Sequence, residues 1–65
     1  MAVKRVVELI AGSPQSWEEA VENGVKEAAK FAKDIRRVYV KNLMCNVSEG
    51  KIVEYRAEIR ISVTV

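Results

Sequence analysis

Residues 53–65 alternate between apolar and polar side chains more regularly than any other part of the chain. The apolar set is Val53, Tyr55, Ala57, Ile59, Ile61, Val63 and Val65, and the polar set is Glu54, Arg56, Glu58, Arg60, Ser62 and Thr64. Successive side chains of a strand point to opposite faces, so this pattern predicts a strand with one face toward a core.

Two other segments favour strands, with less regular patterns. Residues 3–11 are rich in β-branched side chains and are followed by Gly12, where we expect the first strand to end. Residues 36–47 form the second predicted strand, but neither of its faces is purely apolar. This indicates either two partly covered faces or a bulge that shifts the register. Residues 48–51 are predicted to form a turn in which Gly50 adopts a positive φ.

Between the first two strands, the apolar residues have the spacing of a helix. Ser16 and Glu19 have the spacing of a capping box, and Ser13 followed by Pro14 is a rival helix start. The apolar stripe consists of Trp17, Ala20, Val21, Gly24, Val25, Ala28, Phe31, Ala32 and Ile35. Its small central residues would allow a close approach to a sheet. Asp34 is expected in the last turn.

These segments predict an α+β fold of order β-α-β-β in a single domain covering residues 1–65. A helical crossover makes the first two strands parallel, and the final hairpin makes the third strand antiparallel to the second. The most regular strand therefore lies in the centre of a three-stranded sheet of order 1-3-2, with one helix on one face. The other face carries alternating charges at Glu54, Arg56, Glu58 and Arg60. This row is either a solvated surface or a polar wall between subunits or around a cavity.

The composition indicates a folded chain that is small for independent stability. Its 65 residues are 49% hydrophobic and 31% charged, with a formal net charge of +2. The core of a domain this short rarely contributes more than about 3–5 kcal/mol, so such chains usually add disulfides, a metal or further copies. The single Cys45 excludes an internal disulfide, and no metal ligands are obvious. We therefore expect self-association.

The same counts exclude several classes of function. The absence of His excludes imidazole catalysis and His-ligated metals, and one cysteine cannot form a thiolate zinc site. No serine has a base at motif spacing and there is no Gly-rich phosphate loop, so we predict that the protein is not an enzyme. We expect Cys45 to be a buried, inert thiol. We also expect no membrane span, no secretory signal and a cytoplasmic location.

Two features suggest ligands from the residues alone. Basic residues gather near the junction of the helix and the second strand, with an aromatic residue among them: Lys4, Arg5, Lys33, Arg36, Arg37 and Tyr39. Nucleic-acid binding is one explanation, but helix ends and strand edges attract basic residues in any case, and a net charge of +2 argues against it. Trp17 could stack on a flat ligand, but its place on the apolar stripe favours packing.

Three stretches of sequence, in order, carry a family resemblance. Residues 3–12 read V-K-R-V-V-E-L-I-A-G, residues 12–20 read G-S-P-Q-S-W-E-E-A, and residues 54–63 read E-Y-R-A-E-I-R-I-S-V. In these stretches, and in its length, the chain resembles the dodecins across nearly its full extent. The resemblance implies a β-α-β-β chain whose sheet wraps its helix, twelve copies of which build a hollow shell. Such a homododecamer would bury surface that one chain cannot.

Most dodecins are flavin-binding and storage proteins, so the resemblance implies a flavin such as riboflavin, FMN or FAD. The family's Trp, which stacks on the flavin ring, corresponds to Arg37 in this chain. The family's Gln, which bonds the polar edge of the ring, corresponds to Arg56, and an acidic or polar pocket neighbour corresponds to Asn42. Guanidinium groups replace both signature contacts. They can stack on a planar ring or bind an anionic ligand such as a phosphate.

A branch of dodecins with a similar S-W-E-x-A helix start and an Arg in place of the pocket Trp is associated with calcium, and this sequence looks closer to that branch. Calcium takes about six to eight oxygen ligands, so carboxylates of several subunits would be needed. The candidates are Glu49, Glu54 and Glu58. We therefore predict a non-catalytic homododecameric shell that binds or stores a small ligand, with flavin as the usual ligand of the family. A calcium-binding or purely structural shell is the first alternative, and a small nucleic-acid-binding protein is the second.

Overall fold

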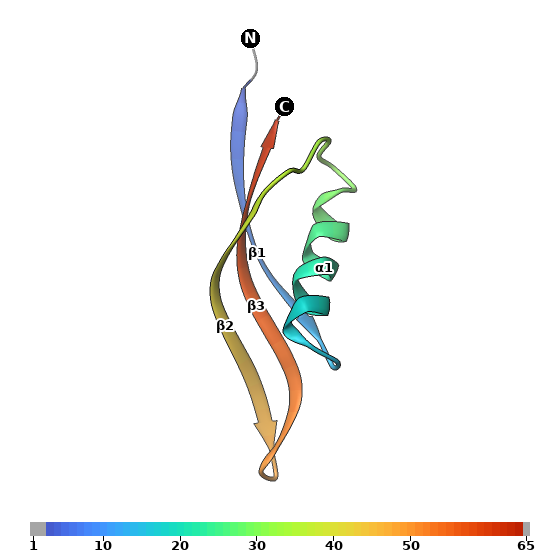
Figure 1. The fold of residues 1–65 in the computed structure, drawn as a ribbon, viewed down its shortest axis with the longest axis vertical. Helices are drawn as coiled ribbons and strands as arrows, with labels where there is room; N and C mark the ends of the chain where they lie inside the picture. The colour runs from blue at the N-terminus through green and yellow to red at the C-terminus, as the bar shows by residue number, and fades with distance from the viewer. Residues whose placement is uncertain (1–2, 65) are drawn as a thin grey trace.

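The structure, a computed structural model, describes residues 3–64. Its elements follow the chain in the order β1 (Lys4–Ser13), α1 (Trp17–Ala28), β2 (Val38–Ser48) and β3 (Lys51–Thr64) (Figure 1). β3 lies between β1 and β2 and is antiparallel to both. The helix covers one face of this sheet. The predicted α+β architecture, with strand order 1-3-2 and one helix, is confirmed.

The alternation along β3 creates the core. The side chains of Ala57, Ile59, Ile61 and Val63 are buried, together with the helix and post-helix residues Ala20, Ala28 and Ala32. Small side chains on the helix meet branched side chains on the sheet, so the two layers approach closely. Val53, predicted on the same face, is exposed, and it is the extra residue where the pairing with β2 shifts register a second time. Val65 lies outside the described residues.

The helix begins at Ser16, as the capping-box spacing predicts. The Ser16 hydroxyl accepts a hydrogen bond from the Glu19 backbone N–H at 3.0 Å. The carboxylate half of the box differs from the prediction, because the Glu19 carboxylate accepts from the Ser13 hydroxyl at 2.8 Å. Ser13, the rival start, is 1% exposed and also accepts from the Gln15 backbone N–H at 2.9 Å. Both serines therefore stabilise one helix start.

The helix ends at Ala28, and the prediction that it continues to Asp34 was wrong. Residues 29–31 form a turn, Lys33 forms an isolated antiparallel bridge with Thr64, and Asp34 has a left-handed φ of 60°. The backbone of Lys33 cannot remain helical while it pairs with Thr64, the last residue of β3. The chain therefore leaves the helix early to reach the end of the sheet.

Apolar spacing past the helix end explains this error. Ala32 is buried and Ile35 is half-buried against the core, although neither is helical. Phe31, which a continuous helix would place on the buried stripe, is 61% exposed. Two of these three apolar positions thus contact the core from an irregular segment that mimics helical periodicity.

The second strand begins later than predicted and contains a bulge. β2 starts at Val38, and residues 34–37 belong to the connection that precedes it. Its pairing with β3 shifts register between Val40 and Asn42, which leaves Lys41 as the extra residue. The bulge explanation for the poor alternation of this segment is therefore confirmed.

The β2–β3 hairpin projects beyond the helix (Figure 1). Glu49 and Gly50 at its turn both have positive φ values, 53° and 75°, of which only that of Gly50 was predicted. The radius of gyration is 13.2 Å, compared with about 11 Å for a compact domain of this length. Within residues 3–64, no helix has the length and hydrophobicity needed to cross a membrane.

Candidate functional site

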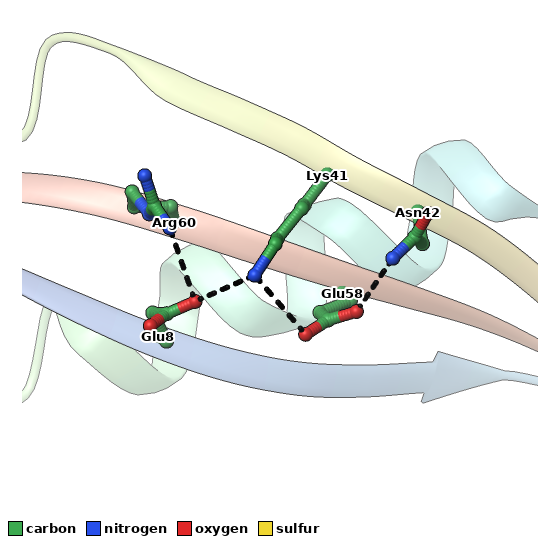
Figure 2. Close-up of polar contacts among 5 residues, drawn as sticks. All are labelled: Glu8, Lys41, Asn42, Glu58 and Arg60. Carbon is green, nitrogen blue, oxygen red and sulfur yellow. Dashed lines mark hydrogen bonds and ion pairs between the residues drawn. The ribbon is translucent and has the colours of Figure 1, made fainter.

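Charged side chains from all three strands meet on the face of the sheet opposite the helix (Figure 2). Lys41, at the bulge of β2, lies with its Nζ 3.5 Å from Glu8 Oε2 on β1 and 3.9 Å from Glu58 Oε2 on β3. Glu8 Oε2 also lies 3.5 Å from an Arg60 nitrogen, and Asn42 Nδ2 donates to Glu58 Oε1 at 2.8 Å. The bulge thus places one ammonium group between two carboxylates.

A second polar cluster lies nearer the hairpin turn. Asn46 Nδ2 donates to Glu54 Oε1 at 2.9 Å. The same oxygen is 3.7 Å from Arg56 Nε, which is an ion pair but too long for a hydrogen bond. Arg56 Nε is a buried atom with no hydrogen-bond partner among the described residues. The Arg56 guanidinium therefore forms an ion pair with Glu54, but its Nε donates no hydrogen bond among the described residues.

A groove with a volume of about 330 Å³ lies at the other end of this polar face. It is lined by Lys4, Asp34, Arg36, Arg37, Tyr39, Ser62, Val63 and Thr64. Lys4 pairs with Thr64, and Tyr39 pairs with Arg60. Directly paired residues of antiparallel strands point to the same side, so these side chains share the face of the charged network.

The structure separates the three predicted flavin contacts within one chain. Arg37 lines the groove, whereas Arg56 lies outside it, in register with Gly12 and Met44. Asn42 lies between them along the sheet and is bonded to Glu58. A pocket built from all three positions would therefore need more than one copy of the chain, and these assignments stay predictions.

The calcium candidates are also apart in a single chain. Glu54 and Glu58 lie on one face of β3, four residues and therefore about 13 Å apart along the strand, and Glu49 lies in the hairpin turn. Residues 3–64 contain no group of three or more His, Cys, Asp or Glu side chains that could hold a metal ion. One chain offers separate oxygen donors, and a complete calcium site would need donors from several copies.

Several residues of the polar face were missed by the sequence analysis. Glu8 and Lys41 carry the central network, and Ser62 and Thr64 line the groove. The position of these side chains depends on the register of strand pairing, which could not be predicted from the sequence. The signal was present for Glu8, because it lies in the same phase of β1 as Lys4 and an antiparallel register would have placed it beside the polar face of β3.

Comparison with known proteins gives a consistent result. The sequence profile of the Dodecin family matches residues 3–65. The calcium dodecin of Mycobacterium tuberculosis is 38% identical over 64 residues, which cover 95% of this chain and 87% of that protein.

Solved structures agree with this match. A crystal structure of calcium dodecin from M. tuberculosis, described as calcium chelating with a novel calcium-binding site, has a TM-score of 0.83 at 36% identity and covers 92% of this chain and 86% of that chain. Dodecin from Streptomyces coelicolor has a TM-score of 0.91 at 19% identity, covering 98% of this chain and 91% of that chain. At that identity the likeness concerns the fold alone.

Proposed function

The chain belongs to the dodecin family, and we propose that it acts without catalysis as one unit of a homododecameric shell that binds calcium. The proposal has two parts, assembly and ligand. The first is supported by the surface that a single chain leaves uncovered. The second is supported by the side chains at the pocket positions of the family and by the calcium dodecin of M. tuberculosis as a relative.

Assembly is supported by exposed apolar side chains on the part of the sheet that the helix does not cover. On the β2–β3 hairpin and its flanks these are Val40, Leu43, Met44, Val47, Ile52 and Val53, each at least 41% exposed. Leu43 pairs with the core-facing Ala57 and Met44 pairs with Arg56 on the polar face, so these side chains lie on both faces of the hairpin. Exposed apolar side chains in this number on a small protein favour contact with another molecule. We infer that copies of the same chain cover these side chains, because the resemblance to the dodecins implies a closed shell.

The choice of calcium rests on the correspondence that the family resemblance implies, in which Arg37 and Arg56 replace the two flavin contacts of the family. Arg37 lies in a groove with two other cations, and Arg56 is drawn toward Glu54. Neither position offers the uncharged ring or amide that the usual flavin pocket has. The same face carries carboxylates beside amides, at Glu58 with Asn42 and at Glu54 with Asn46, and oxygen donors of this type suit calcium.

The calcium ligands in this proposal are Glu54 and Glu58, completed by carboxylates of other copies, with Glu49 as the candidate from the hairpin turn. Bound calcium would neutralise carboxylates that face one another across subunit contacts. The binding site therefore depends on assembly, and calcium in turn should stabilise the assembly. A ligand present at about 100 times its dissociation constant stabilises the folded state by about 2.7 kcal/mol.

The test uses protein stripped of metal with EDTA, followed by calorimetric titration with calcium chloride and thermal unfolding with and without calcium. We expect saturable binding and a calcium-dependent rise in melting temperature. Glu58→Gln should weaken binding at least tenfold. Glu22→Gln, an equal charge change on the exposed side of the helix, is the matched control and should leave the affinity within twofold.

Flavin is the alternative ligand, and the same protein tests it. Riboflavin fluorescence should be unchanged on addition of the protein. Saturable quenching of riboflavin, together with the absence of calcium binding, would replace calcium by flavin in the proposed function. If Glu22→Gln weakened calcium binding as strongly as Glu58→Gln, the assignment of Glu58 as a calcium ligand would be wrong.

A further inference from the structure

We propose that the polar face of the sheet, opposite the helix, packs against the same face of a second copy about a twofold axis, and that ion pairs join the two copies. The contact involves four alternating charges of β3, which we call the charge row: Glu54, Arg56, Glu58 and Arg60. This inference rests on the assembly in the proposed function. It goes beyond that function by naming the surface, the orientation and the residues through which two copies meet.

The charge row has capacity for partners outside the chain. Its side chains are between 28% and 47% exposed, and Figure 2 shows Glu58 and Arg60 on the polar face. Within residues 3–64, Arg56 has a single ion pair, to Glu54, and its Nε donates no hydrogen bond. A guanidinium has several N–H donors and can contact more than one carboxylate. Arg56 can therefore pair with an acid of another molecule.

The charge row is complementary to itself when its direction is reversed. Its signs alternate, so the row of a second copy running antiparallel places an opposite charge at every position. Glu54 then faces Arg60 of the second copy, and Arg56 faces Glu58 of the second copy. The twofold axis repeats both pairs and passes at the level of Ala57, midway along the row. Sheets packed face to face lie about 10 Å apart, a gap that one acidic and one basic side chain can bridge.

The other twofold arrangement of the same two faces is disfavoured. An axis parallel to β3 would align the two charge rows in the same direction, so each charge would face a copy of itself. Like charges opposed across an interface suppress association. The alternation of signs therefore selects the antiparallel arrangement.

Apolar side chains flank the charge row near the level of the axis. Ile10 on β1 pairs with Glu58, and Met44 on β2 pairs with Arg56, so both lie on the polar face. Their side chains are 58% and 41% exposed. In the antiparallel arrangement β1 faces β1 and β2 faces β2, so these side chains shield the central ion pairs from water on both sides. Ion pairs that are partly removed from water are screened less by salt.

The contact is compatible with the proposed calcium ligands. In the antiparallel arrangement, Glu54 and Glu58 of the second copy are the diagonal neighbours of Glu58 in the first. Carboxylates of two copies thus lie near one another, as a calcium site built from several copies requires. The ion pairs do not include calcium, so the contact should persist when calcium is removed.

The experiment uses two charge reversals in EDTA. Arg56→Glu places an acid opposite Glu58 of the second copy, and Glu58→Arg places a base opposite Arg56 of the second copy. Each variant alone should assemble about tenfold more weakly than the parent, or worse, in light scattering over a dilution series. In a closed shell of twelve equivalent copies, tetrahedral symmetry supplies both twofold and threefold contacts. Loss of the twofold contact should therefore leave folded particles of lower mass, with unchanged circular dichroism.

A mixture of the two variants is the decisive sample. The two proteins are combined in equal amounts in urea and refolded together. An Arg56→Glu chain that faces a Glu58→Arg chain has opposite charges at both central positions, so the mixture should recover the parental mass. Effects within one chain, such as loss of the ion pair between Arg56 and Glu54, are the same alone and in the mixture. Recovery therefore reports on the contact between copies.

Matched controls carry the same charge changes away from the polar face. Lys26→Glu and Glu22→Arg, both at exposed positions of the helix, should keep the parental mass. Arg56→Gln and Glu58→Gln remove one charge without creating repulsion, so they should weaken assembly less than the reversals. They provide the test if a reversal does not fold, and parental assembly of both would then contradict the contact.

Two results with an assembled parent would overturn this contact alone. One is that Arg56→Glu or Glu58→Arg keeps the parental mass at every dilution. The other is that the mixture stays at the lower mass although both variants are folded. A parent that does not assemble would overturn the assembly itself, and this contact with it.

Discussion

The indole nitrogen of Trp17 donates a hydrogen bond to the backbone carbonyl of Met44 at 2.9 Å, which joins the first residue of the helix to the middle of β2. The Trp17 ring also meets the Tyr55 ring edge to face, with centroids 4.9 Å apart and planes at 79°. Tyr55 lies on β3. One side chain therefore ties the helix start to the two strands of the projecting hairpin, and the prediction that Trp17 packs rather than stacks on a ligand agrees with this geometry.

Trp17→Phe should destabilise the protein by about 0.5–1.5 kcal/mol, because it keeps an aromatic ring but removes the donor to Met44. Tyr55→Phe preserves the ring contact and is the control, with little expected change. The measurement is urea unfolding followed by circular dichroism at one protein concentration, since assembly makes stability concentration-dependent. Equal stability of parent and Trp17→Phe would show that the hydrogen bond contributes nothing.

Gly24→Ala should destabilise the protein although alanine favours helices by about 1 kcal/mol over glycine. The added Cβ would lie 2.6 Å from Ile59 Cδ1 and 3.2 Å from Ala11 Cβ. Ile59 is fully buried, so its Cδ1 would have to repack within the core, and overpacking of this kind should cost about 1–3 kcal/mol.

Ile59→Val removes the clashing methyl group and provides the control for Gly24→Ala. The double variant should be more stable than the sum of the two single effects predicts. Strict additivity in thermal or urea unfolding would contradict a direct contact between the helix and Ile59 at this point.

The order of the strands was predictable from sequence because it depends on strong and independent signals. The alternation through Ala57, Ile59 and Ile61 identifies a strand with one buried face, and a helical crossover followed by a hairpin leaves that strand in the centre. The helix start was predictable for a similar reason, since Ser16 and Glu19 interact locally.

The helix end and the site depend on tertiary pairing, which the sequence does not display. Ala32 and Ile35 continue a helical spacing while the backbone leaves the helix to bridge Lys33 to Thr64. The basic cluster was visible in sequence, but its acid and hydroxyl partners were not. Asp34 enters the groove only through the early helix end, and Ser62 enters through the register with β1.

Lys41→Gln should tighten calcium binding, because it removes an ammonium group 3.9 Å from Glu58 Oε2. Two unit charges at about 4 Å in water interact by about 1 kcal/mol, which corresponds to about fivefold in affinity. The gain should shrink as salt concentration rises, because the pair is partly exposed.

Lys30→Gln is the matched control for Lys41→Gln, since Lys30 pairs with Glu27 on the helix at 3.0 Å. Its calcium affinity should equal that of the parent in the same titration. Weaker calcium binding by Lys41→Gln would contradict the assignment of Glu58 as a ligand.

The most direct test of the proposed assembly is the mass of the native particle by light scattering at micromolar protein concentration. Twelve chains of 7.3 kDa predict a particle of about 88 kDa with the secondary structure of Figure 1. A folded, stable particle of 7.3 kDa would contradict the proposal, because the apolar hairpin surface would then have no sister chain to cover it.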